Sequence, residues 1–183
     1  MTAVRTTTDL TDRIRRAIRD VPDFPKPGIL FKDITPLLAD ASLFRETTDA
    51  MAEGFLADRI THVVAIESRG FILGAPVAQR LKAGFVPVRK AGKLPAKTVA
   101  EEYALEYGTD TLEVHADACE WARKPRVLIV DDVLATGGTA DATRRLIEGL
   151  GAEVVGFSFL IALGFLPGVA RLRERSARAL VTY

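Results

Sequence analysis

Short apolar runs of strand length alternate with amphipathic stretches of helix length along most of this chain. The apolar runs are His62–Ile66, Phe85–Val88, Val127–Val130 and Val154–Leu160. Between them, Phe71–Lys82 and Thr139–Leu150 have the spacing of helices. Strands that alternate with helices in this way form βαβ units. The sequence therefore predicts a single α/β domain over residues 1–183, with a central, mostly parallel sheet and helices on both faces.

The N-terminal part is less regular. Apolar residues from Leu10 to Val21 have helical spacing behind Thr8 and Asp9, which can cap a helix. Three prolines and a glycine between positions 22 and 28 then end this helix, so we expect an irregular, partly rigid hood segment over residues 22–38. A second amphipathic helix is expected after Ser42.

Residues 89–107 are rich in Lys and Glu and lack a regular apolar period. We expect a long loop here, with at most a small hairpin that pairs Tyr103–Glu106 with Thr111–His115 across a turn at Gly108. Loops of this length in compact domains are usually functional lids or disordered segments. The sequence therefore predicts a flexible lid over residues 89–114.

Composition excludes several classes of function. The chain has 25 Lys and Arg against 24 Asp and Glu, which argues against nucleic-acid binding by a basic face. The polar N-terminus lacks the apolar core of a secretory signal, and no apolar run has the length of a membrane span. With one cysteine and two histidines, neither an intramolecular disulfide nor a Cys/His zinc site can form. We therefore expect a cytoplasmic protein without nucleic-acid or membrane partners, and we assign no role to Cys119 or Trp121.

The strongest chemical signal follows Val127–Val130. This buried strand leads into Asp131 and Asp132, and residues 136–139, Thr-Gly-Gly-Thr, then begin a helix. Glycines allow successive backbone N–H groups to turn toward one point at a helix N-terminus, where the helix dipole also favours an anion. The pattern predicts an anion-binding loop beside two carboxylates.

Other nucleotide-binding loops do not fit this pattern. No lysine follows Gly137-Gly138, and neither a P-loop nor a dinucleotide-binding glycine motif occurs in the chain. The bound group is better interpreted as a monophosphate, with the acids accepting hydrogen bonds from sugar hydroxyls. The alternative is a tight strand-to-helix turn, which we would favour for the glycine pair alone. Two adjacent carboxylates at a buried strand end cost stability unless a ligand uses them, so we favour a ribose 5-phosphate site.

Residues 127–139 resemble the signature for phosphoribosyl diphosphate (PRPP) of the type I phosphoribosyltransferases. Three further stretches resemble the adenine phosphoribosyltransferases within that family: residues 24–34 (FPKPGILFKDI), residues 67–71 (ESRGF), and residues 89–95 (RKAGKLP) with residues 105–108 (LEYG). The similarity runs in order from about Asp23 to Leu163. It implies the type I phosphoribosyltransferase fold, with a small N-terminal hood and a flexible lid.

The resemblance implies transfer of the phosphoribosyl group of PRPP to adenine, which gives AMP and pyrophosphate. The sugar carbon becomes oxocarbenium-like as pyrophosphate leaves, as in glycoside cleavage. Asp131 and Asp132 match the acidic pair that binds the ribose hydroxyls and places negative charge near this cation. The residues that match the 5-phosphate loop are Ala135, Thr136, Gly137, Gly138 and Thr139. Mg²⁺ is implied as a cofactor that arrives on PRPP, and no residue is assigned as a protein metal ligand.

Pyrophosphate needs cations. Ser68 and Arg69 match the family's pyrophosphate loop, whose backbone often contains a cis peptide. Arg89, Lys90 and Lys93 are interpreted as further pyrophosphate ligands, which in relatives can act across the interface of a homodimer. Taken one at a time, each of these three also fits a solvated basic rim. The resemblance implies a homodimer here too.

For the base, the resemblance assigns backbone groups of Leu30, Phe31 and Lys32 to the adenine edge. Val133 and Leu160 would lie on either side of the ring, although plain core packing would explain them equally well. Glu106 matches the lid glutamate that handles the proton on the base, and its alternative is an exposed hairpin acid.

Two other functions and two surface features remain to be weighed. A 6-oxopurine phosphoribosyltransferase, for example for xanthine or hypoxanthine, would share most motifs, but residues 24–34 resemble the adenine type. A non-catalytic regulator that senses PRPP would need a DNA-binding module. The residues before Pro22 contain a single predicted helix, and such a module needs more than one helix.

The basic C-terminal run is interpreted as a solvated helix face; it comprises Arg171, Arg173, Arg175 and Arg178. We expect a structural role for His115.

Overall fold

The structure is a computed structural model that describes residues 7–104, 108–120, 122–172 and 176–183. Within these residues a seven-stranded sheet has the order β5-β6-β4-β3-β7-β8-β9. Its strands are β3 (His62–Ile66), β4 (Gly84–Lys90), β5 (Thr98–Ala104), β6 (Thr109–His115), β7 (Arg126–Leu134), β8 (Glu153–Ala162) and β9 (Ala177–Thr182). The five strands from β4 to β9 in this order are parallel, and β5 and β6 add an antiparallel hairpin at one edge. The predicted α/β fold with a mostly parallel sheet is confirmed.

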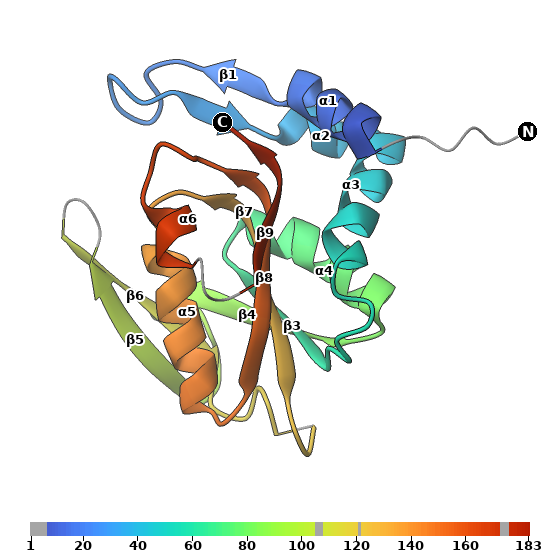
Figure 1. Ribbon diagram of the computed structural model, residues 1–183. Coiled ribbons are helices and arrows are strands. Elements are labelled where there is room, and N and C mark those ends of the chain that lie inside the picture. The colour runs from blue at the N-terminus through green and yellow to red at the C-terminus, as the bar shows by residue number, and fades with distance from the viewer. Residues whose placement is uncertain (1–6, 105–107, 121, 173–175) are drawn as a thin grey trace, which may run out of the picture.

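Helices cover both faces of the sheet (Figure 1). α3 (Ala41–Glu53) and α4 (Arg69–Leu81) lie on one face, and α5 (Gly138–Gly149) lies on the other. Because side chains alternate along a strand, each central strand contributes to two cores. Val63 and Leu128 pack toward the α4 face, whereas Val64 and Ile129 pack toward the α5 face, and all four are fully buried. This explains why the central strands have uninterrupted apolar sequences.

The crossover connections diverge at the centre of the sheet. β3 continues through α4 to β4 on one side, and β7 continues through α5 to β8 on the other, with the two helices on opposite faces. In open α/β sheets, ligands bind outside the carboxyl ends of the strands at such a switch point. The topology therefore directs attention to the residues that follow Ile66 and to the end of β7.

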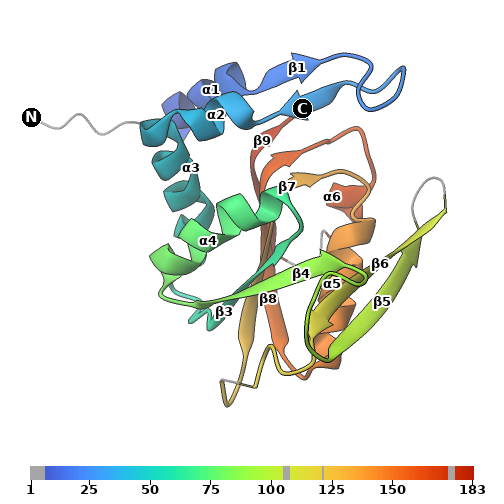
Figure 2. The same cartoon turned by 180° about the vertical axis from the view of Figure 1, so that it is seen from behind.

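The N-terminal layer, residues 7–39, lies across the carboxyl end of the sheet (Figures 1 and 2). It contains α1 (Thr7–Ala17), β1 (Arg19–Val21), β2 (Phe31–Asp33) and α2 (Thr35–Ala39). The first helix was expected to reach Val21, which is wrong because it ends at Ala17. Residues 22–30 are irregular as expected, but the rest of the segment expected to be irregular, up to residue 38, forms β2 and most of α2. β1 pairs antiparallel with β2, and opposite charges on partner residues support the pairing: Arg19 faces Asp33 and Asp20 faces Lys32.

The lid also differs from its expected form. The long loop predicted for residues 89–107 is wrong, because β4 includes Arg89 and Lys90 and because Thr98–Ala104 is a full strand paired with β6. The polar outer face of this hairpin hides its strand period, while Leu112 and Val114 are buried on its inner face. A salt bridge of 2.5 Å from Arg145 to Glu101 ties β5 to α5. Glu106 lies outside the described residues.

The C-terminal part corrects two further expectations. β7 continues through Leu134, so Asp131 and Asp132 are strand residues and do not lie in a loop after the strand. Arg178 lies in β9, where its guanidinium packs 5.1 Å from the ring centre of Phe55, so a solvated helix face is wrong for this arginine. Arg171 is an exposed residue at the end of the short helix α6 (Gly168–Arg171), and Arg173 and Arg175 fall outside the described residues. Among the described helices, none has the length and apolar character needed to cross a membrane.

Candidate active site

The two adjacent acids have different surroundings. The side chain of Asp132 is 8% exposed and forms an ion pair with Nε of Arg69, at the start of α4. The carboxylate of Asp131 accepts a hydrogen bond of 2.9 Å from the backbone N–H of Asp132. Burial, together with the negative charge of Asp132, raises the pKa of Asp131 well above its usual value. One acid is therefore neutralised by a cation, and the other is held in a site that disfavours its charge.

A glycine allows α4 to approach these acids. A Cβ atom on Gly70 would lie 2.9 Å from Oδ1 of Asp131 and 3.1 Å from the carbonyl oxygen of Val130. A larger residue would push the helix start away from β7, and Arg69 would move with it. The peptide bond between Glu67 and Ser68 is cis, as the family resemblance implied for this loop.

The phosphate loop, residues 135–139, joins β7 to α5. Gly137 has a φ of 77° and stands at the N-cap of α5, where no side chain caps the helix. The first N–H groups of a helix have no intrahelical partner, so these amides are available to an anion. A small cavity of about 70 Å³ lies here; Asp131, Val133, Ala135, Thr136, Gly137 and Thr139 are among the residues that line it. The structure thus brings the predicted phosphate residues together next to Asp131.

Two of the cations predicted to bind pyrophosphate, Arg89 and Lys93, lie around Glu67, which the sequence reasoning left without a role. Glu67 accepts hydrogen bonds from Nε of Arg89 and the backbone N–H of Lys90, both of 3.1 Å, and from Nζ of Lys93. Burial acts to raise the pKa of Glu67, but these hydrogen bonds outweigh it, and the pKa is lowered. Glu67 is therefore ionised at neutral pH and fixes two cationic side chains beside the β3 end. The side chain of Lys90 turns away to Asp110, 3.0 Å from its carboxylate.

A tyrosine connects the lid hairpin to the phosphate loop. The side chain of Tyr103, on β5, interacts with those of Thr139 and Asp110, and the residue is 8% exposed. Burial raises the pKa of its hydroxyl, so the hydroxyl keeps its proton at neutral pH. Through Asp110 the tyrosine is also linked to Lys90. No motif in the sequence indicated this connection, because it joins residues on four separate elements.

The hood segment reaches the same site through Arg69. The guanidinium of Arg69 lies 5.0 Å from the ring centre of Phe31, which in turn contacts the ring of Phe24 edge-to-face at 5.1 Å. Leu30 is 52% exposed. Nζ of Lys32 is 2.7 Å from Asp20 and 3.9 Å above the ring of Tyr183. Arg69 thus contacts both an acid of β7 and an aromatic ring of the hood.

Comparison with known proteins decides the family. A family model described as phosphoribosyl transferase domain matches residues 37–164. The adenine phosphoribosyltransferase of Myxococcus xanthus is 56% identical over 97% of this chain and 96% of its own length. The chain belongs to the adenine phosphoribosyltransferase family.

Crystal structures of two members of this family have the same fold. The enzyme from Rhodothermus marinus is 54% identical, with a TM-score of 0.91 over 96% of this chain and 99% of that one. The enzyme from Saccharomyces cerevisiae, in a complex with an imino-altritol bisphosphate and adenine, is 38% identical, with a TM-score of 0.87 over 94% of this chain and 99% of that one. The family resemblance of the four motifs is therefore confirmed, and so is the fold that it implied.

The other residues predicted for the family's base site have contrasting surroundings. Val133 is partly buried and lines the small cavity beside the phosphate loop. Leu160 is fully buried in the core on the α4 face, so it offers no surface to a ligand in this structure. Their contacts with adenine stay predictions.

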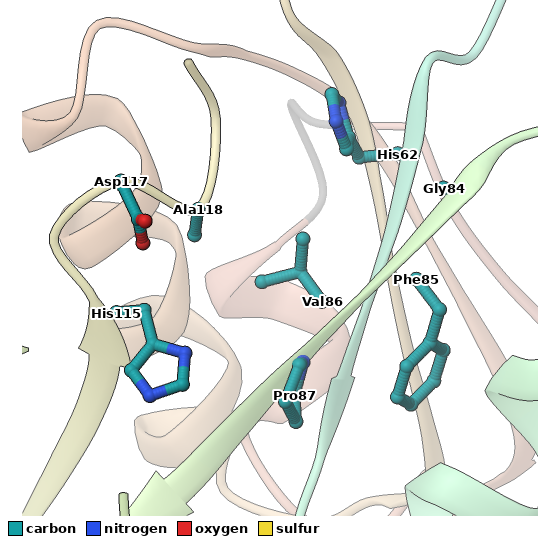
Figure 3. Close-up of a pocket in the computed structure, with 8 residues that line it drawn as sticks. All are labelled: His62, Gly84, Phe85, Val86, Pro87, His115, Asp117 and Ala118. Carbon is teal, nitrogen blue, oxygen red and sulfur yellow. The ribbon is translucent and has the colours of Figure 1, made fainter. Parts of the chain in front are cut away.

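A separate pocket of about 380 Å³ lies where β3 and β4 begin, at the opposite end of these strands from the site that the family motifs form (Figure 3). His62 and Gly84, which begin β3 and β4, line it together with His115 and Asp117. His62 is hydrogen-bonded to Thr61, and burial lowers its pKa. Among the described residues, no group of three His, Cys, Asp or Glu side chains is placed to hold a metal ion.

Proposed function

We propose that this protein transfers the 5-phosphoribosyl group of PRPP to adenine and releases AMP and pyrophosphate. The observation that carries the proposal is the position of three features at one sheet edge. An uncapped helix N-terminus lies beside Asp131, Asp132 lies beside Arg69, and Glu67 holds two further cations at the neighbouring strand end. A sugar that carries a phosphate at one end and pyrophosphate at the other matches this order of charges. The adenine bound to the yeast relative supports the choice of base.

In the proposed reaction a ring nitrogen of adenine forms a bond to the anomeric carbon of PRPP while the bond from that carbon to pyrophosphate breaks. Asp131 and Asp132 bind the ribose hydroxyls, and their negative charge stabilises the oxocarbenium-like carbon. Residues 135–139 hold the 5-phosphate. These contacts fix the sugar so that the base and the leaving group lie on opposite sides of it.

The leaving pyrophosphate is assigned to Ser68, Arg69, Arg89, Lys90 and Lys93. Arg89 and Lys93 already lie together because Glu67 accepts hydrogen bonds from both. Charged donors fixed before substrate binds need no rearrangement when negative charge develops on the leaving group. Lys90 reaches pyrophosphate only if its side chain leaves Asp110.

The base is proposed to bind at the hood segment, against Leu30, Phe31 and Lys32, with Val133 and Leu160 on either side of the ring. Exposed apolar surface at Phe24 and Leu30 suits a planar heterocycle. Since Leu160 is fully buried, a ring that contacts it requires the residues that cover it to move. Glu106 is proposed to take the proton that the base loses, and the lid to exclude water.

PRPP is proposed to bind as its Mg²⁺ complex, with phosphate, sugar and water oxygens as the main ligands. We further propose a homodimer in the cytoplasm. Two apolar side chains support the dimer, because Ile72 on α4 and Phe85 on β4 are 44% and 39% exposed on neighbouring elements.

The decisive experiment measures release of pyrophosphate from PRPP with adenine, hypoxanthine, guanine and xanthine in parallel. Adenine alone should support rapid turnover, and omission of Mg²⁺ should abolish it. Turnover with an oxopurine and none with adenine would reassign the base. Absence of turnover with all four bases, in protein that still binds PRPP, would favour a sensor over an enzyme.

A further inference from the structure

The chain after Leu163, to which no motif was assigned, lies directly against the phosphate loop. The N–H of Leu163 donates a hydrogen bond of 2.9 Å to the carbonyl oxygen of Leu134, and the N–H of Gly168 donates one of 3.0 Å to the carbonyl oxygen of Ala135. These two bonds hold both ends of residues 163–168 along the exit of β7. The C-terminal segment is thereby attached to the backbone that forms the phosphate loop.

The contact at Gly168 is too close for any side chain. A Cβ atom there would lie 2.2 Å from the carbonyl oxygen of Ala135 and 2.9 Å from Cδ1 of Leu134. The nearer atom belongs to the backbone, so no change of rotamer can relieve the overlap. On the other side, a Cβ on Gly137 would lie 3.2 Å from Cα of Gly168 and 3.3 Å from Cδ of Arg171. Gly137 and Gly168 therefore pack backbone against backbone.

The segment that makes these contacts is itself anchored. Leu172, directly after α6, is 1% exposed and belongs to the core on the α5 face. Its N–H donates a hydrogen bond of 3.1 Å to the carbonyl oxygen of Gly168. Gly168 is itself buried, and its displacement is opposed by the anchored Leu172, so an added side chain would press on Ala135, where the phosphate loop begins.

We propose that Gly168 is a positioning residue for the 5-phosphate site: its lack of a side chain and its N–H set the place of the Ala135 carbonyl and so the direction of the loop amides. This inference rests on the proposed function of the loop. In Gly168→Ala, the new Cβ atom and the carbonyl oxygen of Ala135 must move apart by about 1 Å. Displacements of this size in a site can lower activity by up to about 10²-fold. The loss should fall on ligands that carry the 5-phosphate and spare adenine.

The test compares Gly168→Ala with Gly149→Ala. Gly149 ends α5, the helix that begins at the phosphate loop, and a Cβ there would meet no atom within 4 Å. Binding of ribose 5-phosphate and of AMP is measured by calorimetry, with KM for PRPP and for adenine determined separately. We expect Gly168→Ala to weaken both phosphate ligands and raise KM for PRPP about tenfold or more, while KM for adenine changes less than about twofold. Gly149→Ala should match the wild type.

A folded Gly168→Ala protein that binds ribose 5-phosphate like the wild type would overturn the proposal, and so would equal losses for PRPP and adenine. If Gly168→Ala does not fold, Leu172→Val decides the question, because it shortens the buried side chain that anchors Gly168. It should weaken binding of ribose 5-phosphate and raise KM for PRPP more than KM for adenine; unchanged binding or equal changes in the two KM values would refute the proposal. Wild-type protein that binds ribose 5-phosphate but does not convert adenine would overturn the proposed reaction and leave this comparison valid.

Discussion

Replacing Asp131 with Asn should make the protein more stable and much less active. The charged form of Asp131 is disfavoured by burial and by the negative charge of Asp132. Among the described residues, the carboxylate of Asp131 accepts one hydrogen bond, from the N–H of Asp132. Asn keeps a carbonyl oxygen that can accept this bond, carries no charge, and offers an N–H₂ group to the Asp132 carboxylate. The substitution therefore removes an unfavourable charge without leaving an unpaired polar group.

The size of the effect follows from general magnitudes for like charges and hydrogen bonds in proteins. Two like charges about 4 Å apart repel by about 4 kcal/mol at the effective dielectric constant of about 20 that suits protein sites. The hydrogen bond to the charged form returns about 2 kcal/mol. About 2 kcal/mol of destabilisation remains at neutral pH, so Asp131→Asn should raise the melting temperature by roughly 4–8 °C for a domain of this size.

The pH dependence gives the sign of the effect. A raised pKa in the folded state means that the folded protein binds more protons than the unfolded chain, so the contribution of Asp131 is most favourable at low pH and becomes unfavourable as pH rises through its folded pKa. The advantage of Asp131→Asn should therefore be full above that pKa and vanish below the unfolded value of about 3.9. Urea unfolding of both proteins across this pH range measures it.

Asp132→Asn is the matched control and should stabilise the protein less than Asp131→Asn does. It relieves the same repulsion, but its carboxylate is paired with Arg69, so its removal also leaves a cation without its partner, which should cost about 1–3 kcal/mol. Turnover should fall by about 10²-fold or more in Asp131→Asn, because the charge near the developing cation is lost. An Asp131→Asn protein that is less stable than the wild type at neutral pH, or a stability difference that does not change with pH, would refute the reasoning.

Two further predictions concern the lid. Glu106→Ala should lower turnover by about 10²-fold, with the melting temperature unchanged, because a proton-handling group is lost. Glu102→Ala, at an exposed position of β5, is the control. Normal kinetics of Glu106→Ala would contradict the assignment. Tyr103→Phe removes a hydroxyl that interacts with the side chains of Thr139 and Asp110, so it should lower the free energy of unfolding in urea by about 1 kcal/mol and raise KM for PRPP. Because burial raises the pKa of Tyr103, the stability difference from Tyr103→Phe should hold through neutral pH and begin to change only above pH ~10, where an unfolded tyrosine ionises; a change already at pH 7 would count against a role for the hydroxyl.

Local patterns in the sequence were sufficient for the centre of the fold. β3 and β7 are buried on both faces, so their apolar runs could be recognised directly, and the acids near the end of β7 and the glycines that follow it carry their own chemical signature. The strands that lack such an apolar run were missed. β1, β2 and β5 are short or carry polar residues, and their pairing is supported by partners far along the chain, such as Asp33 for Arg19 and Arg145 for Glu101.

The tertiary structure alone decided which side chains meet at the site. Glu67 holds Arg89 and Lys93, and Gly168 packs on Ala135, although no motif or spacing in the sequence predicted these contacts. Spacing along a chain encodes the period of one helix or strand. Contacts between elements depend on the order of the strands in the sheet and on the face that each crossover helix covers. This arrangement is fixed only when the whole core is buried at once.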